Sequence, residues 1–329
     1  MTHPGGFLIS LDFELYWGLR DSFSLKRCKR NLLGVQKAIP AILNIFKKYD
    51  IHATWAVVGF LLFKDRQELL KNLPELKPQY QNNKFSTYSI IDFLDLVERE
   101  QQICFAPSLI EIIKETPHQK IASHTFSHYY CLEEGQNKEM FEADLIASLN
   151  TAKNIGETIE SIVFPKNQVN PEYLKICDDL GIIAYRGTPS QWIYKPSPSN
   201  FGYKMKKILR YIDSFINITG DNTFSIEDIK NNRPYNIPAS RFLRPSSRRI
   251  KVLNSLFLGR ILNSLKIAAK ERKFFHLWWH PHNFGVDLED NLLFLEKILS
   301  FFDRLREDYG IESINMEELV KKYFNVDKA

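Results

Sequence analysis

The chain has 329 residues, of which 44% are hydrophobic and 25% are charged. This composition is ordinary for a soluble globular protein, and the length accommodates either one α/β barrel or two ordinary domains. The formal net charge of +5 is too small to indicate a nucleic-acid partner, so no nucleic-acid binding is expected.

Three features of the sequence concern the compartment in which the chain works. Its four cysteines are scattered and form no Cys-x-x-Cys pair. No secretory signal opens the chain, and its longest uncharged apolar run, residues 53–63, is too short to span a bilayer. We therefore expect a cytoplasmic protein with reduced thiols and no transmembrane segment.

Short apolar runs alternate with amphipathic stretches along the chain. Strands are predicted at residues 7–11, 51–58, 120–123, 161–164, 182–187, 274–280 and 313–315. Helices are predicted at residues 31–49, 59–71, 89–100, 108–115, 138–155, 171–180, 250–272, 288–309 and 316–324. This alternation predicts a mostly parallel sheet covered by helices, with functional residues at the carboxyl ends of the strands.

Residues 188–247 interrupt the alternation with several prolines. We expect an irregular insertion with one helix near residues 203–217, which packs over a rim and does not form an independent domain. Residues 1–329 are therefore interpreted as a single catalytic domain.

Basic residues crowd the region between positions 200 and 260. A solvated basic face is the simpler interpretation, and a surface that meets diphosphate, anionic lipid or acidic glycan is the alternative. The residues are Lys204, Lys206, Lys207, Arg210, Arg241, Arg244, Arg248, Arg249, Lys251 and Arg260.

An acidic pair follows the first predicted strand. Asp12 and Glu14 are two residues apart, so in an extended chain they point to the same side. Two buried carboxylates repel each other unless a cation or a proton lies between them. One carboxylate can thus bind a metal while the other takes a proton from water. The aromatic loop at residues 15–21, with Trp17, is suited to a substrate rim.

Two histidines follow the third predicted strand. His124 and His128 are four residues apart, a spacing that places both imidazoles on one side of a helical turn. Together with one carboxylate they form a two-histidine, one-carboxylate site for a divalent metal, with Zn²⁺ as the first choice. Each residue also has an ordinary interpretation, because carboxylates cap helices and histidines form hydrogen bonds in loops.

A histidine cluster ends the strand predicted at residues 274–280. His276 and His280 share a strand face, and His280 at the strand end is the candidate general acid, whereas His276 is expected in the core. His282 is expected to orient His280 or to contact substrate. Trp17, Trp278 and Trp279 are candidate sugar platforms, with core packing as the alternative for Trp278 and Trp279.

Four motifs and their order resemble the polysaccharide deacetylase family, the NodB-like group known as carbohydrate esterase family 4. The resemblance extends from about residue 6 to residue 320. In residues 11–18 and 277–284 the sequence is similar in particular to a branch of this family found in bacterial O-antigen and capsule gene clusters. The motifs are Asp12-Phe13-Glu14, His124-Thr125-Phe126-Ser127-His128, Phe164-Pro165-Lys166-Asn167-Gln168 and His280-Pro281.

The resemblance implies a deformed (β/α)7 barrel, one divalent metal, and removal of an N- or O-acetyl group from a saccharide in surface polysaccharide biosynthesis. Matching the motifs gives Asp12 the position of the base and His280 that of the acid. Glu14, His124 and His128 take the metal positions. The acetylated saccharide is expected as a polymer, a lipid-linked glycan or a nucleotide sugar.

The resemblance also implies an arginine that orients the catalytic aspartate. Lys166 stands near that place in the sequence, and Arg186 is the other candidate. We further expect a backbone N–H group near Tyr129 or Tyr130 to stabilise the oxyanion.

Two other functions are kept as alternatives. The first is hydrolysis of a non-sugar C–N bond, such as that of a cyclic amide, on the same fold. The second is a non-catalytic glycan-binding protein that retains the fold, which should not need stoichiometric metal.

Overall fold

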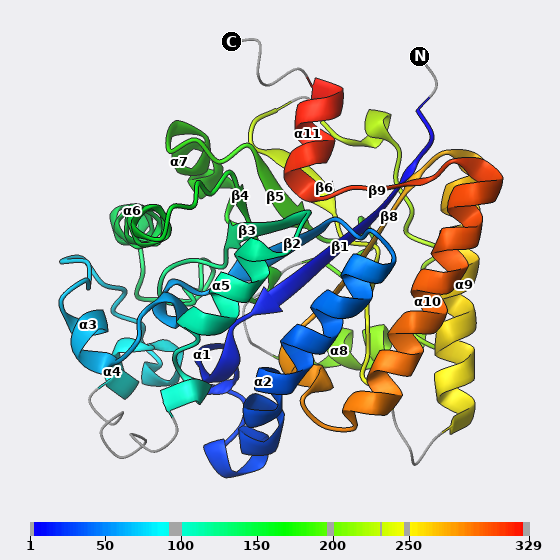
Figure 1. Cartoon of the computed structure of the whole chain (residues 1–329). Coiled ribbons are helices and arrows are strands. Elements are labelled where there is room, and N and C mark those ends of the chain that lie inside the picture. Colours follow the sequence, from blue (N-terminus) through cyan, green and yellow to red (C-terminus); the bar gives the residue numbers. More distant parts are fainter. Residues whose placement is uncertain (1–2, 92–100, 196–200, 231, 247–250, 325–329) are drawn as a thin grey trace.

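The structure, a computed structural model, describes residues 3–91, 101–195, 201–230, 232–246 and 251–324 (Figure 1). Its centre is a parallel sheet in the order β6-β5-β4-β3-β2-β1-β8-β7, with β9 paired to β1. The strands are β1 (Gly6–Phe13), β2 (Ala53–Val57), β3 (Gln119–Ser123), β4 (Ser161–Ile162), β5 (Ala184–Gly187), β6 (Tyr235–Pro238), β7 (Arg241–Phe242), β8 (Phe274–Trp279) and β9 (Glu312–Ser313).

The two outer strands of this order, β6 and β7, are consecutive halves of one stretch of chain. β6 pairs with β5, and β7 pairs with β8. Between them, the N–H of Ala239 donates to the carbonyl of Gly187 in β5, and the N–H of Ser240 donates to that of His276 in β8. Residues 235–242 therefore connect the β5 edge of the sheet to the β8 edge. Together β6 and β7 act as one strand of the barrel. The sheet curls into a deformed (β/α)7 barrel, which confirms the predicted fold class.

The bridging stretch corrects the prediction of an irregular insertion at residues 188–247. That segment does contain a helix near the predicted place, α8 (Phe201–Asp213), but it also supplies β6 and β7 to the barrel. Pro234 and Pro238 flank the short run and mask its strand character, because proline cannot donate to a strand ladder.

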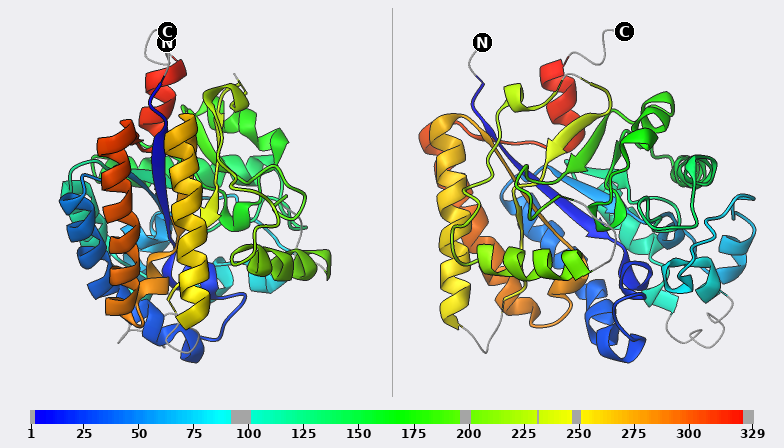
Figure 2. Two further views of the ribbon diagram at one scale, coloured as in Figure 1. Left: turned by 90° about the vertical axis from the view of Figure 1, so that its right-hand side faces the viewer. Right: turned by 180° about the vertical axis from the view of Figure 1, so that it is seen from behind.

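Helices cover the outside of the sheet. In Figure 2, α9 and α10 stand side by side over β1 and β8, and α2 packs next to α10. The helices are α1 (Leu15–Leu19), α2 (Leu25–Lys48), α3 (Arg66–Leu70), α4 (Tyr88–Ile91), α5 (Pro107–Glu115), α6 (Lys138–Asn154), α7 (Leu174–Asp179), α8, α9 (Lys251–Glu271), α10 (Leu288–Tyr309) and α11 (Met316–Phe324). In the described ranges, none of them is both long and apolar enough to cross a bilayer.

Two predicted helices differ from the structure. The helix predicted at residues 59–71 is a short 3-10 helix, Gly59–Leu62, followed separately by α3. Of the helix predicted at residues 89–100, the part at 92–100 lies outside the described residues. Further 3-10 helices are Asn83–Phe85, Pro165–Asn167, Pro171–Tyr173, Ile226–Asp228 and Pro281–Phe284.

The central strand determines where the functional residues lie. All eight residues of β1 are buried, and β1 runs between β2 and β8. Because the neighbouring strands are parallel, their carboxyl ends meet at one edge of the barrel. Asp12 near the end of β1, His124 directly after β3 and His280 directly after β8 are thereby brought to that edge.

Candidate active site

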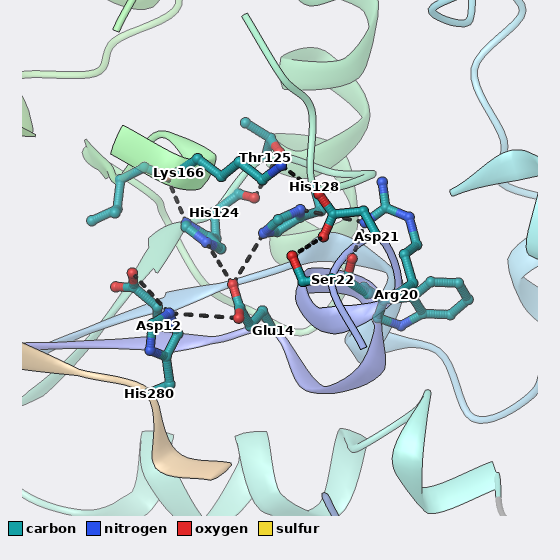
Figure 3. Close-up of polar contacts among 12 residues, drawn as sticks. Asp12, Glu14, Arg20, Asp21, Ser22, His124, Thr125, His128, Lys166 and His280 are labelled. Carbon is teal, nitrogen blue, oxygen red and sulfur yellow. Dashed lines mark hydrogen bonds and ion pairs between the residues drawn. The ribbon is translucent and has the colours of Figure 1, made fainter. Parts of the chain in front are cut away.

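The acidic pair and the two histidines converge at the carboxyl edge of the barrel (Figure 3). Oε2 of Glu14 lies 3.0 Å from Nε2 of His128 and 3.4 Å from Nε2 of His124. Each of these three buried residues offers one ligand atom, and the three atoms lie within 4.8 Å of one another. Two imidazoles and one carboxylate are a donor set that suits Zn²⁺ and leaves coordination positions open.

The hydrogen bonding of His124 fits a metal ligand. Its Nδ1 lies 2.7 Å from the carbonyl oxygen of Val163, so Nδ1 carries the proton and donates it there. Its Nε2 then bears a free lone pair, and this buried atom has no hydrogen-bond partner among the residues that the structure describes. A backbone carbonyl that fixes the tautomer in this way is a usual partner of metal-binding histidines.

The charge states of the other two candidate ligands also suit a cation. Burial lowers the pKa of His128 to about 4, so its imidazole is neutral at pH 7. Burial alone would raise the pKa of Glu14, but His280, His124 and His128 together bring it well below its ordinary value. Glu14 is therefore a carboxylate facing two imidazoles.

The absence of a side chain at Gly18 leaves room for the Glu14 carboxylate. A Cβ atom on Gly18 would lie 2.0 Å from Cδ of Glu14 and within 2.4 Å of both its oxygens. Only glycine is compatible with this packing, since nonbonded carbon atoms do not approach that closely. The short helix α1 therefore covers the carboxylate directly.

The two histidines do not share a helical turn, which corrects the prediction. Thr125 and His128 have left-handed backbone conformations, with φ of 61° and 57°, and the segment after β3 is a loop. Within it, Oγ1 of Thr125 accepts a hydrogen bond of 2.7 Å from the N–H of Tyr129. The loop, and not a helix, brings both imidazoles to Glu14.

A residue that the sequence reasoning missed holds this loop. Asp144 of α6 is fully buried and accepts hydrogen bonds from the N–H groups of Phe126, at 2.7 Å, and Ser127, at 3.1 Å, and from the hydroxyl of Ser127. Burial raises the pKa of Asp144 to about 6. The sequence did contain a sign of this role. Asp144 lies between Phe141 and Leu145 on the side of α6 that is buried and otherwise mostly apolar.

The other acid, Asp12, is paired with an arginine. The guanidinium of Arg186 donates two hydrogen bonds to the Asp12 carboxylate, of 2.6 and 2.7 Å, and one each to Ser10, at 3.0 Å, and Asn167, at 3.2 Å. Burial alone would raise the pKa of Asp12, but Arg186 and then His124 lower it below its ordinary value. Both oxygens of Asp12 thus face a fixed cation.

Lys166, the other candidate for orienting the aspartate, has a different partner. Its ammonium group pairs with Asp21 (Figure 3). The same group lies 4.3 Å from the ring centroid of Tyr130. Of the two candidates, Arg186 is the one in contact with Asp12.

His280 lies beside both carboxylates. Its Nε2 is 3.5 Å from Oε1 of Glu14 and 3.8 Å from Oδ2 of Asp12, and its side chain is 21% exposed. His282 stacks on it at 4.9 Å between ring centroids, and burial lowers the pKa of His282 to about 3. His276 is fully buried and contacts Ser10, at 2.8 Å. The expectation that His276 belongs to the core agrees with this position.

Two of the three tryptophans proposed as sugar platforms are inaccessible. Trp17 is 0% exposed, its indole N–H donates to the carbonyl of Cys104, and its ring packs edge-on against Phe60, so its prediction as a substrate contact is wrong. Trp279 is equally buried. Trp278 is partly exposed and lines the cavity described below.

The backbone donors proposed for the oxyanion are already engaged. The N–H of Tyr129 donates to Thr125, and that of Tyr130 donates to the hydroxyl of Tyr80, at 2.7 Å. Neither is free to bind substrate, because both bonds belong to the packing of the loop.

A cavity of about 700 Å³ opens onto this site. Asp12, Glu14, His128 and His280 line one part of it, and α8 together with residues 239–244 lines another. The volume is typical of sites that bind small organic ligands.

The comparisons with known proteins agree with this architecture. Residues 33–185 match the family model "Polysaccharide deacetylase". Over this range the chain is similar to polysaccharide deacetylases. The matched range includes His124 and His128, whereas Asp12, Glu14 and His280 lie outside it. This similarity supports a carbohydrate deacetylase activity.

Solved structures similar to this chain share its fold at low sequence identity. A protein of Mycobacterium smegmatis named as a polysaccharide deacetylase has a TM-score of 0.60 and 11% identity, with 100% of this chain and 93% of that chain covered. A second, from Pseudomonas aeruginosa PAO1, has a TM-score of 0.57 and 9% identity, with coverage of 99% and 92%. Puue allantoinase has a TM-score of 0.56 and 11% identity, with coverage of 100% and 93%. A comparison with curated proteins found no match.

Proposed function

We propose that the protein is a metal-dependent deacetylase that removes an N- or O-acetyl group from a saccharide during cytoplasmic steps of surface polysaccharide synthesis. The observation that carries this proposal is the separation of roles between two neighbouring acids. Glu14 faces His124 and His128, while Asp12, two residues earlier, is bound to Arg186. One acid is thus available to a metal and the other to a proton.

Glu14, His124 and His128 would hold the divalent cation, with Zn²⁺ as the first choice. The buried, unpartnered Nε2 of His124 supports this set, since such an atom is rarely left unsatisfied. When bound, the cation would supply a Lewis acid that polarises the acetyl carbonyl and makes water more acidic.

The chain's own residues would then move the protons. Asp12 takes a proton on a carboxylate oxygen from the attacking water, and Arg186 keeps that carboxylate ionised and oriented. His280 Nε2 gives a proton to the departing nitrogen or oxygen. Its position, within 4 Å of both acids, places it beside the same reacting centre. His282 stacks on His280 and limits its rotation.

The proposal is tested with a panel of acetylated saccharides, assayed for released acetate with and without added divalent metal. Wild type should act on at least one of them and lose activity after chelation. Asp12→Asn should lower kcat by about 100-fold or more, the usual contribution of a general base, and keep its metal. Full activity of Asp12→Asn with intact metal would refute the assignment of the base.

The same panel separates two alternatives. The fold is shared with Puue allantoinase, so cyclic ureides are included as substrates. Turnover of a ureide without any release of acetate would support hydrolysis of a cyclic amide. A protein without stoichiometric metal and without either activity would support a glycan-binding role.

A further inference from the structure

The cavity is electrostatically divided. Its acids, Asp12 and Glu14, lie at the carboxyl edge of β1. On the side formed by α8 and residues 239–244, every charged residue that lines the cavity within the described part of the chain is cationic. These residues are Lys204, Lys207, Arg210, Arg241 and Arg244.

Part of this positive charge is neutralised inside the protein. Arg241 lies 3.7 Å from Asp213, and Arg260, behind it, lies 3.8 Å from Asp213 and 3.7 Å from Asp221. Two arginines and two aspartates therefore balance each other at the base of α8. Arg241 contributes little net charge to the cavity.

Arg244 is different. Its Nε donates a hydrogen bond of 2.7 Å to Ser214, and its guanidinium carbon lies 4.7 Å from the ring centroid of Tyr211 and 5.8 Å from that of Phe242. Burial lowers the pKa of Arg244, and no carboxylate of the described residues pairs with it. The guanidinium thus contacts two rings, and among the described residues its terminal amino groups have no partner, which prepares it to bind an anion in a bidentate manner.

Two lysines on α8 add to this charge. Lys204 and Lys207 are three residues apart, so they lie on one side of the helix together with Tyr211. Both are exposed, both line the cavity, and neither has an acidic partner among the described residues. Arg248 and Arg249, also in the basic region of the sequence, lie outside the described residues.

We propose that Arg244, Lys204 and Lys207 form a subsite for a phosphate or diphosphate group attached to the saccharide. The proposal rests on the proposed function, because it places the acetyl group at the acid end of the same cavity. Three cations without an acidic partner among the described residues exceed the charge of one carboxylate and match a diphosphate, which carries at least two negative charges at pH 7. A nucleotide sugar and a lipid-linked sugar both present this chemistry.

The subsite is tested by calorimetric titration of the full-length protein with inorganic pyrophosphate at low ionic strength. Arg244→Gln should weaken binding by about tenfold or more, the usual effect of losing a charged hydrogen-bond donor. The double variant Lys204→Gln/Lys207→Gln should also weaken it. Lys206→Gln is the matched control: Lys206 is on the same helix, does not line the cavity and donates to the carbonyl of Lys195. It should change affinity by about twofold or less, because it alters only the long-range charge.

Failure of wild type to bind pyrophosphate, or equal weakening by Arg244→Gln and Lys206→Gln, would overturn the subsite. Metal content is measured in each sample, because diphosphate also binds divalent cations. Binding requires no turnover, so weakening by Arg244→Gln alongside an inactive wild type would refute only the proposed function. An active wild type whose pyrophosphate affinity is unchanged in Arg244→Gln would refute only the subsite.

Two further titrations identify the source of the diphosphate. Uridine diphosphate binding more tightly than pyrophosphate supports a nucleotide-linked substrate, and farnesyl diphosphate binding more tightly supports a lipid-linked one. Equal affinity for all three supports a subsite that recognises the diphosphate alone.

Discussion

Replacing Arg186 should change the pH dependence of catalysis in a direction fixed by the structure. Arg186 donates two hydrogen bonds to the buried Asp12 carboxylate, and its charge is the largest influence that lowers the pKa of Asp12 against burial. In Arg186→Gln burial would dominate, so the pKa of Asp12 should rise. A base with a higher pKa is protonated at higher pH, so the acid limb of kcat/KM should move upward.

The same substitution should affect stability. In wild type the lowered pKa of Asp12 stabilises the fold above the ordinary pKa of an aspartate, and this stabilisation is lost as pH falls through the lowered value. Removing one partner of a buried ion pair typically costs about 3–5 kcal/mol, because the other charge remains buried and unpaired. Urea unfolding at pH 7 should show a loss of that size, and the loss should become smaller at acidic pH, where Asp12 is protonated.

The assay is release of acetate from a neutral acetylated substrate between pH 4 and pH 9, for wild type and three variants. Arg186→Lys keeps the charge but cannot form two parallel hydrogen bonds, so kcat should fall by about tenfold with a smaller shift of the acid limb. Lys166→Gln is the control, since Lys166 pairs with Asp21, and its acid limb should not move. An unmoved acid limb in Arg186→Gln would refute the role given to Arg186.

Three further predictions concern packing around the site and one buried acid. Gly18→Ala should displace the Glu14 carboxylate and reduce the bound metal. The control Gly259→Ala, at a position with open space around it, should keep its metal, and equal metal content in the two variants would contradict the prediction. Asp144→Ala should weaken metal affinity by about 10- to 100-fold by releasing the histidine loop, and Asp144→Asn, which keeps one acceptor, should weaken it less; a normal affinity in the alanine variant would contradict this. Burial raises the pKa of Glu317 to about 7 from an ordinary 4.5, so stability should fall as pH rises between these values. Urea unfolding should show that Glu317→Gln removes this fall. Relative to wild type, the free energy of unfolding of the variant should be up to about 3 kcal/mol more favourable at pH 8 than at pH 5, and an unchanged pH dependence would contradict this.

The position of the site followed from the sequence because parallel strands place their carboxyl ends at one edge. The strands predicted directly before Asp12, His124 and His280 were enough to bring these residues together. The fold class followed from the same alternation of strands and helices.

Other features depend on contacts between distant segments. Asp12 and Arg186 are 174 residues apart, and their pairing decides which acid faces the histidines. Trp17 was expected on the rim, but in a five-residue helix the aromatic pattern does not show which side faces the core. The backbone N–H of Tyr130 was expected to be free, yet the hydroxyl of Tyr80, 50 residues away, accepts its hydrogen bond.

Short strands were the other source of error. β6 has four residues and β7 has two, and prolines border or end the first of them. Such runs carry too few alternating positions to stand out from a loop. Their role in closing the barrel becomes evident only from their partners, β5 and β8.

The division of roles between the two acids is tested most directly by the metal content of purified variants, measured by elemental analysis. Wild type and Asp12→Asn should each contain about one divalent ion per chain. Glu14→Gln and His128→Ala should contain much less under the same conditions, because their side chains supply the ligand atoms. Loss of the metal in Asp12→Asn together with its retention in Glu14→Gln would contradict this division and exchange the roles of the two acids.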